Sequence, residues 1–278
     1  MSFADLTFIN NCKHILEHGV SSEGEDVRPK WPDGTCAHTL RVFGLINRYD
    51  LADEFPALTL RRLAFKSAVD EILWIWQKKS NNVNELSSKI WDAWADKDGS
   101  IGKAYGYQLR QKHTYKEGLF DQVDRVLYDL KHNPTSRRIL TSMYNFDDLS
   151  EMGLYPCAYG MTFNVTNGRL NAILHQRSQD FLAANNWNVA QYAVLLFMFA
   201  ISSGLQAGEL VHVIADAHIY DRHIPIVEEL IKLEPRPAPK LVINPDVSDF
   251  YEFKVDDFRL KGYAPHDFNK HHKFEVAV

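Results

Sequence analysis

The fold of this chain is decided by residues 155–188, which read YPCAYGMTFNVTNGRLNAILHQRSQDFLAANNWN. Apolar residues alternate with polar or small ones on both sides of Asn167-Gly168. An Asn-Gly pair in this setting favours a two-residue type I′ turn, because both central residues of that turn have positive φ. The segment is therefore predicted to form a β-hairpin in which Met161 faces Leu174.

The same register brings three reactive groups to the open end of the hairpin. Cys157 falls opposite Ser178 and next to Arg177. Side chains alternate between the two faces of a strand, so in a regular strand Arg177 and Ser178 point in opposite directions. Convergence of the guanidinium on the thiol therefore requires a bulge or a local twist.

Three segments around the hairpin have the spacing of helices. Residues 3–18 and 60–76 carry apolar side chains at i, i+3, i+4 and i+7, which is typical of amphipathic helices. Residues 188–201 are mostly apolar and too short to cross a bilayer, so we interpret them as a buried helix. No linker, repeat or low-complexity stretch divides the chain, which favours a single large domain spanning residues 1–278.

Glu71 lies within the helix predicted for residues 60–76, off its apolar stripe. Its helical neighbours nevertheless include Ala64, Trp74 and Ile75. A carboxylate among apolar side chains has a raised pKa and can act as an acid or a base near neutral pH. On spacing alone, the commoner arrangement is a glutamate at the rim of the core, paired with a lysine.

Composition narrows the classes of function and of location. Hydrophobic residues make up 45% of the 278 residues, which is enough for a sizeable core, and the formal charge of -5 disfavours a general nucleic-acid binder. The three cysteines, Cys12, Cys36 and Cys157, lack metal-ligand spacing and cannot all pair, which suggests a reducing cytosol. The first residues do not have the pattern of a signal peptide. We therefore expect a cytoplasmic protein without a membrane anchor.

Several other residue groups suit particular ligands. Arg28 and the adjacent Arg137 and Arg138 lie in predicted loops; such loops are usually just solvated, but they can also bind anions. Trp91 and Trp94 are either core residues or a stacking wall for a flat heterocycle. The spacing of histidines and aspartates in residues 216–223 matches no zinc motif, so we expect no metal.

Taken together, the short motifs resemble those of folate-dependent thymidylate synthases. Each motif alone is weak, but nine of them stand in the order of that family and cover essentially the whole chain. They are Asp70-Glu71-Ile72-Leu73-Trp74, Ile90-Trp91-Asp92-x-Trp94, Tyr105-Gly106-x-Gln108, Ser136-Arg137-Arg138, Pro156-Cys157, Gln176-Arg177-Ser178-x-Asp180, Asn188-Val189-Ala190-Gln191-Tyr192-Ala193, Asp216-Ala217-His218-Ile219-Tyr220-x-x-His223 and Glu234-Pro235-Arg236-Pro237-x-Pro239.

The resemblance implies a fold and a reaction. The fold is α+β, a mixed sheet flanked by helices that stacks on the sheet of a second subunit. The reaction is reductive methylation of dUMP to dTMP, with 5,10-methylenetetrahydrofolate as donor of both carbon and hydride. Cys157 adds to uracil C6 and makes C5 nucleophilic, and the nearby Arg177 lowers the pKa of the thiol. Glu71, acting through water with Tyr105 and Asn188, manages protons at O4 and C5.

The resemblance also implies the binding residues of an obligate homodimer with shared active sites. In each active site, the resemblance implies that Asn188 reads uracil O4 and N3 and that His218 and Tyr220 hold the ribose. The dUMP site comprises Arg28, Arg177, Ser178, Asp180, Asn188, His218 and Tyr220, with Arg137 and Arg138 reaching in from the second subunit. The folate site comprises Ile90, Trp91, Trp94, Asp180, Ala184, Trp187 and Val278.

The chain departs from the family pattern at several positions. Ala184 stands in place of a usual glycine, Trp187 in place of a phenylalanine, and Ala158 where many members have histidine. The first two departures face folate and pyrimidine. A shifted pterin would let water replace hydride, so a pyrimidine hydroxymethylase that makes 5-hydroxymethyl-dUMP is the alternative. A non-catalytic RNA-binding homologue is a remote alternative, which the negative charge disfavours.

Overall fold

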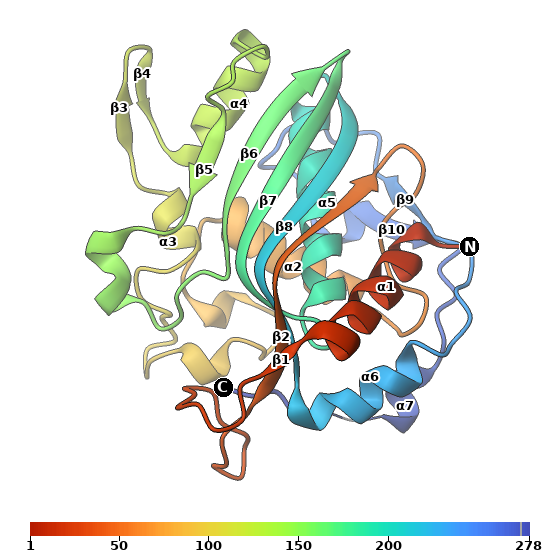
Figure 1. Cartoon of the computed structure of the whole chain (residues 1–278). Coiled ribbons are helices and arrows are strands. Elements are labelled where there is room, and N and C mark those ends of the chain that lie inside the picture. Colours follow the sequence, from red (N-terminus) through yellow and green to blue (C-terminus); the bar gives the residue numbers. More distant parts are fainter. Residues whose placement is uncertain (273) are drawn as a thin grey trace.

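A six-stranded sheet forms the frame of the molecule in the computed structural model, which describes residues 1–272 and 274–278. Its strands lie in the order β1-β2-β8-β7-β6-β5 (Figure 1). β7 and β8 run parallel and the other neighbours antiparallel, so the sheet is mixed, as predicted. The strands are β1 (Val20–Ser21), β2 (Thr39–Asp50), β5 (Leu140–Ser142), β6 (Ala158–Thr166), β7 (Arg169–Asp180) and β8 (Gln206–Tyr220).

Helices and two small sheets surround this frame. The helices are α1 (Phe3–His18), α2 (Phe65–Trp76), α3 (Gly106–Leu109), α4 (Gln122–His132), α5 (Asn185–Ser202), α6 (Ile224–Leu230) and α7 (Phe268–His271). One small sheet pairs β3 (His113–Tyr115) with β4 (Gly118–Phe120), and the other pairs β9 (Lys240–Ile243) with β10 (Phe258–Lys261). Among the described residues, no helix is both long and apolar enough to cross a membrane.

The hairpin predicted from the Asn-Gly pair is β6 and β7. Both turn residues, Asn167 and Gly168, have positive φ, and Met161 pairs with Leu174 as expected. Further from the turn, the register shifts between Ala158 and Gly160. This shift confirms that an irregularity interrupts the ladder near the nucleophile.

The shift corrects the predicted partner of Cys157. The backbone N–H of Arg177 donates to the Cys157 carbonyl over 2.9 Å, so Cys157 lies opposite Arg177 and not opposite Ser178. The prediction was wrong by one residue, because a turn fixes register only until a bulge adds a residue to one strand. The bulge residue is Tyr159.

The irregularity continues across the neighbouring strands. β7 and β8 pair Gln176 with Ile214 and Ser178 with Asp216, and β2 and β8 pair Phe43 with Asp216 and Leu45 with Ile214. The ladder therefore skips Arg177, Ala215 and Gly44, and Gly44 has a φ of 83° that favours glycine. One row of the sheet is thus distorted from β6 to β2, and Arg177 lies in that row.

The helix predicted to start at residue 60 begins at Phe65. The preceding chain is held by contacts from distant segments: the Asp5 carboxylate accepts the N–H of Thr59, and the Tyr263 hydroxyl accepts that of Leu63. Tertiary hydrogen bonds thus override the local helical pattern. The helix predicted for residues 3–18 matches α1, and the buried helix predicted for residues 188–201 is α5, which starts slightly earlier.

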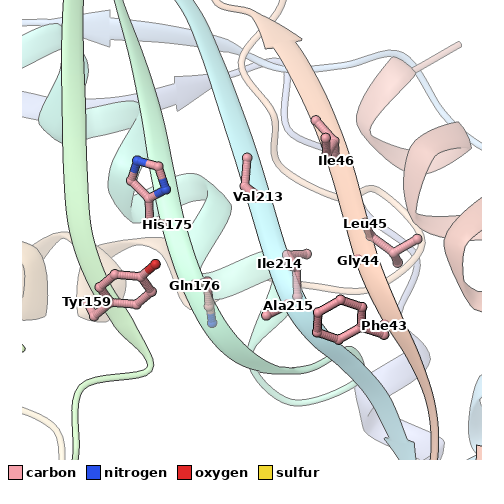
Figure 2. Close-up of a pocket in the computed structure, with 10 residues that line it drawn as sticks. All are labelled: Phe43, Gly44, Leu45, Ile46, Tyr159, His175, Gln176, Val213, Ile214 and Ala215. Carbon is pink, nitrogen blue, oxygen red and sulfur yellow. The ribbon is translucent and has the colours of Figure 1, made fainter.

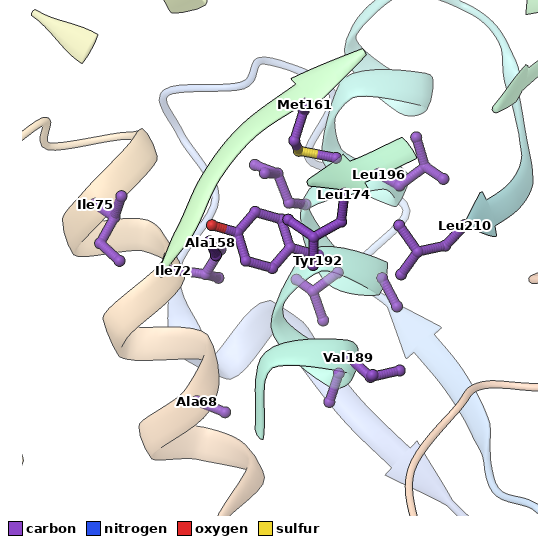
Figure 3. Packing of buried hydrophobic residues seen from close by; sticks show 14 of the residues in the cluster. Ala68, Ile72, Ile75, Ala158, Met161, Leu174, Val189, Tyr192, Leu196 and Leu210 are labelled. Carbon is purple, nitrogen blue, oxygen red and sulfur yellow. The ribbon is translucent and has the colours of Figure 1, made fainter. Parts of the chain in front are cut away.

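The core lies between one face of the sheet and its helices. α5 runs along the back of the sheet in the view of Figure 1 and contacts β7, β8 and α2. Figure 3 shows Met161 and Leu174 of the hairpin meeting Tyr192 and Leu196 of α5, all of them buried. Burial of each such side chain contributes roughly 1.5–3 kcal/mol, so this packing fixes the hairpin against α5.

The opposite face of the sheet carries exposed apolar side chains. Phe43 is 89% exposed and Ile46 is 65% exposed. Together with Tyr159, His175 and Val213 they line a shallow cavity of about 300 Å³ along the distorted row (Figure 2). Apolar side chains of this size are usually buried, so this face is suited to contact another protein surface.

Candidate active site

Cys157 and Arg177 meet at the open end of the hairpin. Arg177 Nη2 lies 3.6 Å from Cys157 Sγ. The guanidinium is fixed by two backbone carbonyls, because Nε donates to Pro156 over 3.0 Å and Nη2 donates to Tyr155 over 2.7 Å. The bulge therefore produces the convergence that a regular strand forbids.

The thiol of Cys157 is less acidic than we predicted. Burial raises its pKa, and this effect outweighs the lowering by Arg177 and Arg28. The predicted lowering of the pKa by Arg177 is confirmed, and burial, which the sequence does not show, has the larger and opposite effect. A thiol in an apolar site resists ionisation, because the thiolate loses its hydration.

Tyr105 contacts the nucleophile through the backbone. The Cys157 N–H donates to the Tyr105 hydroxyl oxygen over 3.0 Å. Burial raises the pKa of Tyr105, and its ring packs edge-on against Trp91 with centroids 4.9 Å apart. Since the oxygen accepts this bond, the hydroxyl proton is available to a ligand.

Glu71 is buried in α2, with 5% of its surface exposed. Burial raises its pKa to about 7, and nearby donors on Gln191, Trp187 and Trp91 partly offset that rise. Trp187 Nε1 donates to Glu71 Oε2 over 3.1 Å. The rim position with a lysine partner, favoured by spacing alone, is therefore wrong, because α5 packs over this side of α2.

The side-chain amide of Asn188 lies in a buried cluster of glutamines. Gln176 Nε2 donates to Asn188 Oδ1 over 3.2 Å, and Gln179 Nε2 lies 3.4 Å from the same oxygen. On the other side, Asn188 Nδ2 donates to Gln191 Oε1 over 3.2 Å. A flipped amide would place its NH₂ group against two donors, so the cluster fixes the direction of the amide.

Backbone carbonyls and one histidine orient these glutamines in turn. Gln176 Nε2 also donates to the Ser178 carbonyl, and Gln191 Nε2 donates to that of Ala68. Gln176 Oε1 therefore faces His212 Nε2, 2.8 Å away, and the ring nitrogen must be the donor. Burial lowers the pKa of His212 to about 3, so the ring is neutral at physiological pH.

Residues at the end of β8 form another wall of the site. His218 and Tyr220 are buried and pack edge-on with centroids 5.1 Å apart, and His218 Nδ1 lies 2.6 Å from Asp216 Oδ1. Burial raises the pKa of Tyr220, and the charges of Asp180, Arg28, Cys157 and Asp216 also act on it. The end of β8 therefore lies close to the nucleophile.

The C-terminus lies beside the loop that carries Arg28. Val278 and Lys30 exchange two backbone hydrogen bonds of 3.0 and 2.9 Å, and Ala277 is buried with Trp31. Figure 1 shows this end of the chain next to the loop before β2. Arg28 itself is exposed. The loop is thus packed against the C-terminal residues and is not simply solvated.

The expected folate residues come from two segments. Trp91 packs against Trp94 with centroids 5.8 Å apart, and Ile90 beside them is exposed. At the β7–α5 connection, Asp180 Oδ1 accepts the N–H of Ala183, Ala184 precedes the first turn of α5, and Trp187 follows within it. Trp91 and Trp187 both act on Glu71, so the two segments meet there.

Arg137 and Arg138 are not near Cys157 of the same chain. Both are exposed and precede β5, where Leu140 pairs with Thr162. Continuing this alignment places Arg138 beside Asn164, about 23 Å along β6 from Cys157 at roughly 3.3 Å per residue. An arginine side chain cannot span that distance.

The prediction from sequence missed the glutamine cluster. Gln176 and Gln191 belonged to recognised motifs but received no role, and Gln179 and His212 were not considered. One signal was available: His212 stands between Val211 and Val213 in a strand of apolar residues. A polar side chain in such a strand usually has a buried partner.

Comparisons with known proteins agree with this geometry. The sequence profile of the family described as "Thymidylate synthase" matches residues 6–278. The thymidylate synthases of Bacillus licheniformis and of Bacillus phage phi3T are 46% and 45% identical to this chain, over the full length of each pair. The solved structure of thermostable thymidylate synthase A from Bacillus subtilis superposes with a TM-score of 0.94 at 43% identity and covers 100% of both chains.

Proposed function

This chain belongs to the thymidylate synthase family, and from that premise we propose how its residues convert dUMP to dTMP. The enzyme is a methyltransferase that methylates dUMP. The observation that carries the proposed mechanism is the 3.6 Å contact between Arg177 Nη2 and Cys157 Sγ. This contact places the Arg177 cation beside the thiol of Cys157. The same site holds the buried acid Glu71, the hydroxyl of Tyr105 and the oriented amide of Asn188.

Cys157 is the proposed nucleophile. Its sulfur adds to C6 of the uracil ring, and the electron pair of the C5–C6 double bond moves toward O4 to give an enolate. Arg177 and Arg28 favour the thiolate that this step consumes, because both lower the pKa of the thiol against the effect of burial. When the methyl group is complete, the C6–S bond breaks and Cys157 returns as the leaving group.

Asn188 is the proposed reader of the pyrimidine. Its amide direction is fixed, with Oδ1 toward Gln176 and Nδ2 toward Gln191. Uracil presents an N3–H donor to Oδ1 and an O4 acceptor to Nδ2, so the fixed amide matches uracil. Cytosine presents the reverse pair. Discrimination between the two bases thus rests on an amide that cannot flip.

Glu71 and Tyr105 are the proposed proton-transfer groups. The enolate that forms at O4 needs a proton donor, and the hydrogen on C5 must leave before the new methylene forms. With its pKa raised to about 7, Glu71 can hold or release a proton at neutral pH. The Tyr105 hydroxyl accepts the Cys157 N–H and so keeps its own proton for the substrate.

The phosphate of dUMP is proposed to bind Arg28, Arg177 and Ser178. Arg177 donates to backbone carbonyls through Nε and Nη2, which directs the remaining Nη1 toward the phosphate. His218 and Tyr220 are proposed to hold the ribose hydroxyl. Arginine is suited to this role, because its planar fork binds two phosphate oxygens at once.

The family implies a folate co-substrate, and the residues present fit one. Trp91 Nε1 and His223 Nδ1 are buried polar atoms with no hydrogen-bond partner among the described residues. Trp91 packs against Trp94 in an aromatic wall, and His223 Nδ1 lies 4.0 Å from Asp180 Oδ2. An aromatic wall and buried polar atoms without partners are what a flat, polar pterin requires. We propose that Ile90, Ala184, Trp187 and Val278 complete this site. Bound 5,10-methylenetetrahydrofolate would supply the one-carbon unit and the hydride.

A homodimer with shared active sites is proposed from the position of Arg137 and Arg138. They lie about 23 Å from Cys157 along the sheet, so they can bind the phosphate only in another copy of the chain. The exposed apolar face around Phe43 and Ile46 offers a surface on which a second sheet can stack. Stacking of this face would bury both side chains.

Mixing two inactive variants tests the shared site. Each homodimer of Arg138→Ala is impaired in every site, and each homodimer of Cys157→Ala is inactive. After dissociation and reassociation, the mixed dimer has one site with both residues intact, so activity should return. If the mixture stays as inactive as its parents, both residues act within one chain.

The reaction product tests the proposed chemistry. Incubation with dUMP and 5,10-methylenetetrahydrofolate should give dTMP and dihydrofolate, seen as the rise in absorbance that dihydrofolate causes. Tetrahydrofolate and a hydroxymethyl nucleotide, without that rise, would contradict the methylation mechanism. The relatives named above all carry the name thymidylate synthase, which does not favour the hydroxymethylase or the RNA-binding alternative.

A further inference from the structure

Trp187 makes a contact that a phenylalanine at the same position could not make. Its indole Nε1 donates a hydrogen bond to Glu71 Oε2 over 3.1 Å. We propose that Trp187 is a positioning residue for the reaction, which holds the Glu71 carboxylate in place and stabilises its ionised form. The proposal rests on the proposed role of Glu71 in proton transfer.

The surroundings of Glu71 make this hydrogen bond important. The carboxyl group is buried, and the titratable groups that act on it are Asp70 on its own helix and Tyr192 on α5, neither of which is a cation. A buried carboxylate without a cation depends on neutral donors. Trp187 supplies such a donor at 3.1 Å, and Gln191 and Trp91 also act on the carboxylate.

The other candidate donors are less well placed. Gln191 Nε2 is directed to the carbonyl of Ala68, and its Oε1 accepts from Asn188. Trp91 Nε1 is buried and acts on the carboxylate, but it forms no hydrogen bond of normal geometry with any of the described residues. Loss of the Trp187 N–H therefore removes a direct donor and leaves Gln191 and Trp91 as the neutral groups that act on the carboxylate.

The contact also links two parts of the site. Trp187 and Asn188 are consecutive residues in the first turn of α5. The first residue fixes the carboxylate on α2, and the second carries the amide that the glutamines orient. One helical turn thus sets the distance between the proton-transfer group and the base-reading group. A phenylalanine would leave the carboxylate free to change rotamer.

Nuclear magnetic resonance of the substrate-free enzyme tests the contact directly. The six tryptophans give six indole N–H signals after labelling with ¹⁵N-tryptophan, and the Trp187 signal is the one lost in Trp187→Phe. Trp187→Tyr, which fills more of the space, gives a second assignment if the phenylalanine variant folds poorly. The Trp187 signal should shift with pH, with a midpoint near 7, and this shift should vanish in Glu71→Gln.

Kinetics supply a second readout with a matched control. Without the donor that favours the carboxylate, the pH midpoint of kcat should be about one pH unit higher in Trp187→Phe. Trp31→Phe removes another indole donor, which binds the Asp221 carboxylate over 3.0 Å, and should leave the midpoint unchanged.

Two results would overturn the proposal. One is a Trp187 signal that does not shift near pH 7, or that shifts equally in Glu71→Gln. The other is the same pH midpoint of kcat in Trp187→Phe as in the native enzyme. A native protein without any turnover of dUMP counts against the proposed function instead, and the resonance measurement still tests the contact.

Discussion

The backbone N–H of Cys157 donates to the Tyr105 hydroxyl oxygen over 3.0 Å, and this bond ties the nucleophile to a segment 52 residues earlier in the chain. The bond fixes the start of β6 without using the thiol. It also leaves the hydroxyl proton of Tyr105 directed away from Cys157 and free for the substrate. Positioning and proton donation thus come from one side chain.

Tyr105→Phe should lower kcat strongly and destabilise the site modestly. The substitution leaves the Cys157 N–H without an acceptor, which costs about 1–3 kcal/mol for a buried donor, and removes the proposed proton. Steady-state kinetics and urea unfolding at one protein concentration measure both effects. Tyr128→Phe, on α4 and remote from the site, should behave as the native enzyme does. Native turnover in Tyr105→Phe would contradict the role of this hydroxyl.

Arg177→Lys should raise the pKa of Cys157 and weaken dUMP binding. A lysine keeps the charge but cannot donate to the carbonyls of Tyr155 and Pro156 while facing the sulfur. The pH dependence of alkylation at Cys157 measures the pKa of the thiol; it is followed by peptide mass spectrometry, because the exposed Cys36 reacts with the same reagent. Arg169→Lys, at a partly exposed ion pair with Asp50, is the control. An unchanged alkylation profile would refute the contribution of Arg177.

Glu71→Gln should abolish turnover but stabilise the fold at alkaline pH. The folded-state pKa of about 7 lies above the ordinary value of 4.5, so the folded protein binds this proton more tightly than the unfolded chain does. The stability that the group contributes is fully present below pH 4.5 and is lost as pH rises through 7. Ionisation of Glu71 should therefore cost about 3 kcal/mol above pH 7, and the neutral glutamine avoids that cost.

Urea unfolding at two pH values checks this sign. The free energy of unfolding of Glu71→Gln should exceed that of the native protein at pH 8, and the gap should narrow toward pH 5. Protein concentration must be equal in both series, since subunit association contributes to apparent stability. A gap that is the same at both pH values would contradict the raised pKa.

His212→Leu should raise the KM for dUMP with a smaller effect on kcat. The neutral ring donates to Gln176 Oε1 over 2.8 Å, and without it the glutamine that orients Asn188 loses one anchor. A lost buried hydrogen bond of about 1.4 kcal/mol corresponds to about tenfold in binding. Initial rates at saturating folate measure the KM. A native KM in His212→Leu would show that Gln176 orients Asn188 without the histidine.

Local signals in the sequence predicted part of this structure. The Asn167-Gly168 turn needs only its own backbone angles, so the hairpin and the pairing of Met161 with Leu174 were correct. The apolar run of α5 likewise identified a buried helix. A bulge was expected because Arg177 and Cys157 could not otherwise converge. No local pattern predicts its position at Tyr159, because the interruption of the ladder continues through β8 and β2.

The parts of the site that were missed depend on packing between distant elements. Glu71 was expected at the rim because its own helix cannot reveal that α5 covers it and that Trp187 binds it. The lowering of the Cys157 pKa by Arg177 was predicted correctly because the cation is visible in the sequence, whereas the larger effect of burial is not. Gln176 and His212 meet only because β7 and β8 run side by side. The family motifs predicted a catalytic role for Glu71, whereas helical spacing alone favoured a rim glutamate.

Attack of Cys157 on C6 of the pyrimidine forms a covalent complex, and trapping that complex tests the proposed mechanism. The chain is incubated with 5-fluoro-dUMP and 5,10-methylenetetrahydrofolate, digested and mapped by mass spectrometry. In dUMP the hydrogen on C5 is removed as a proton. The fluorine that replaces it cannot be removed in this way, so the covalent complex accumulates. A ternary adduct is expected on the peptide that contains Cys157, and none in Cys157→Ser, although that variant should still bind dUMP. An intact chain without adduct on Cys157 would contradict the account.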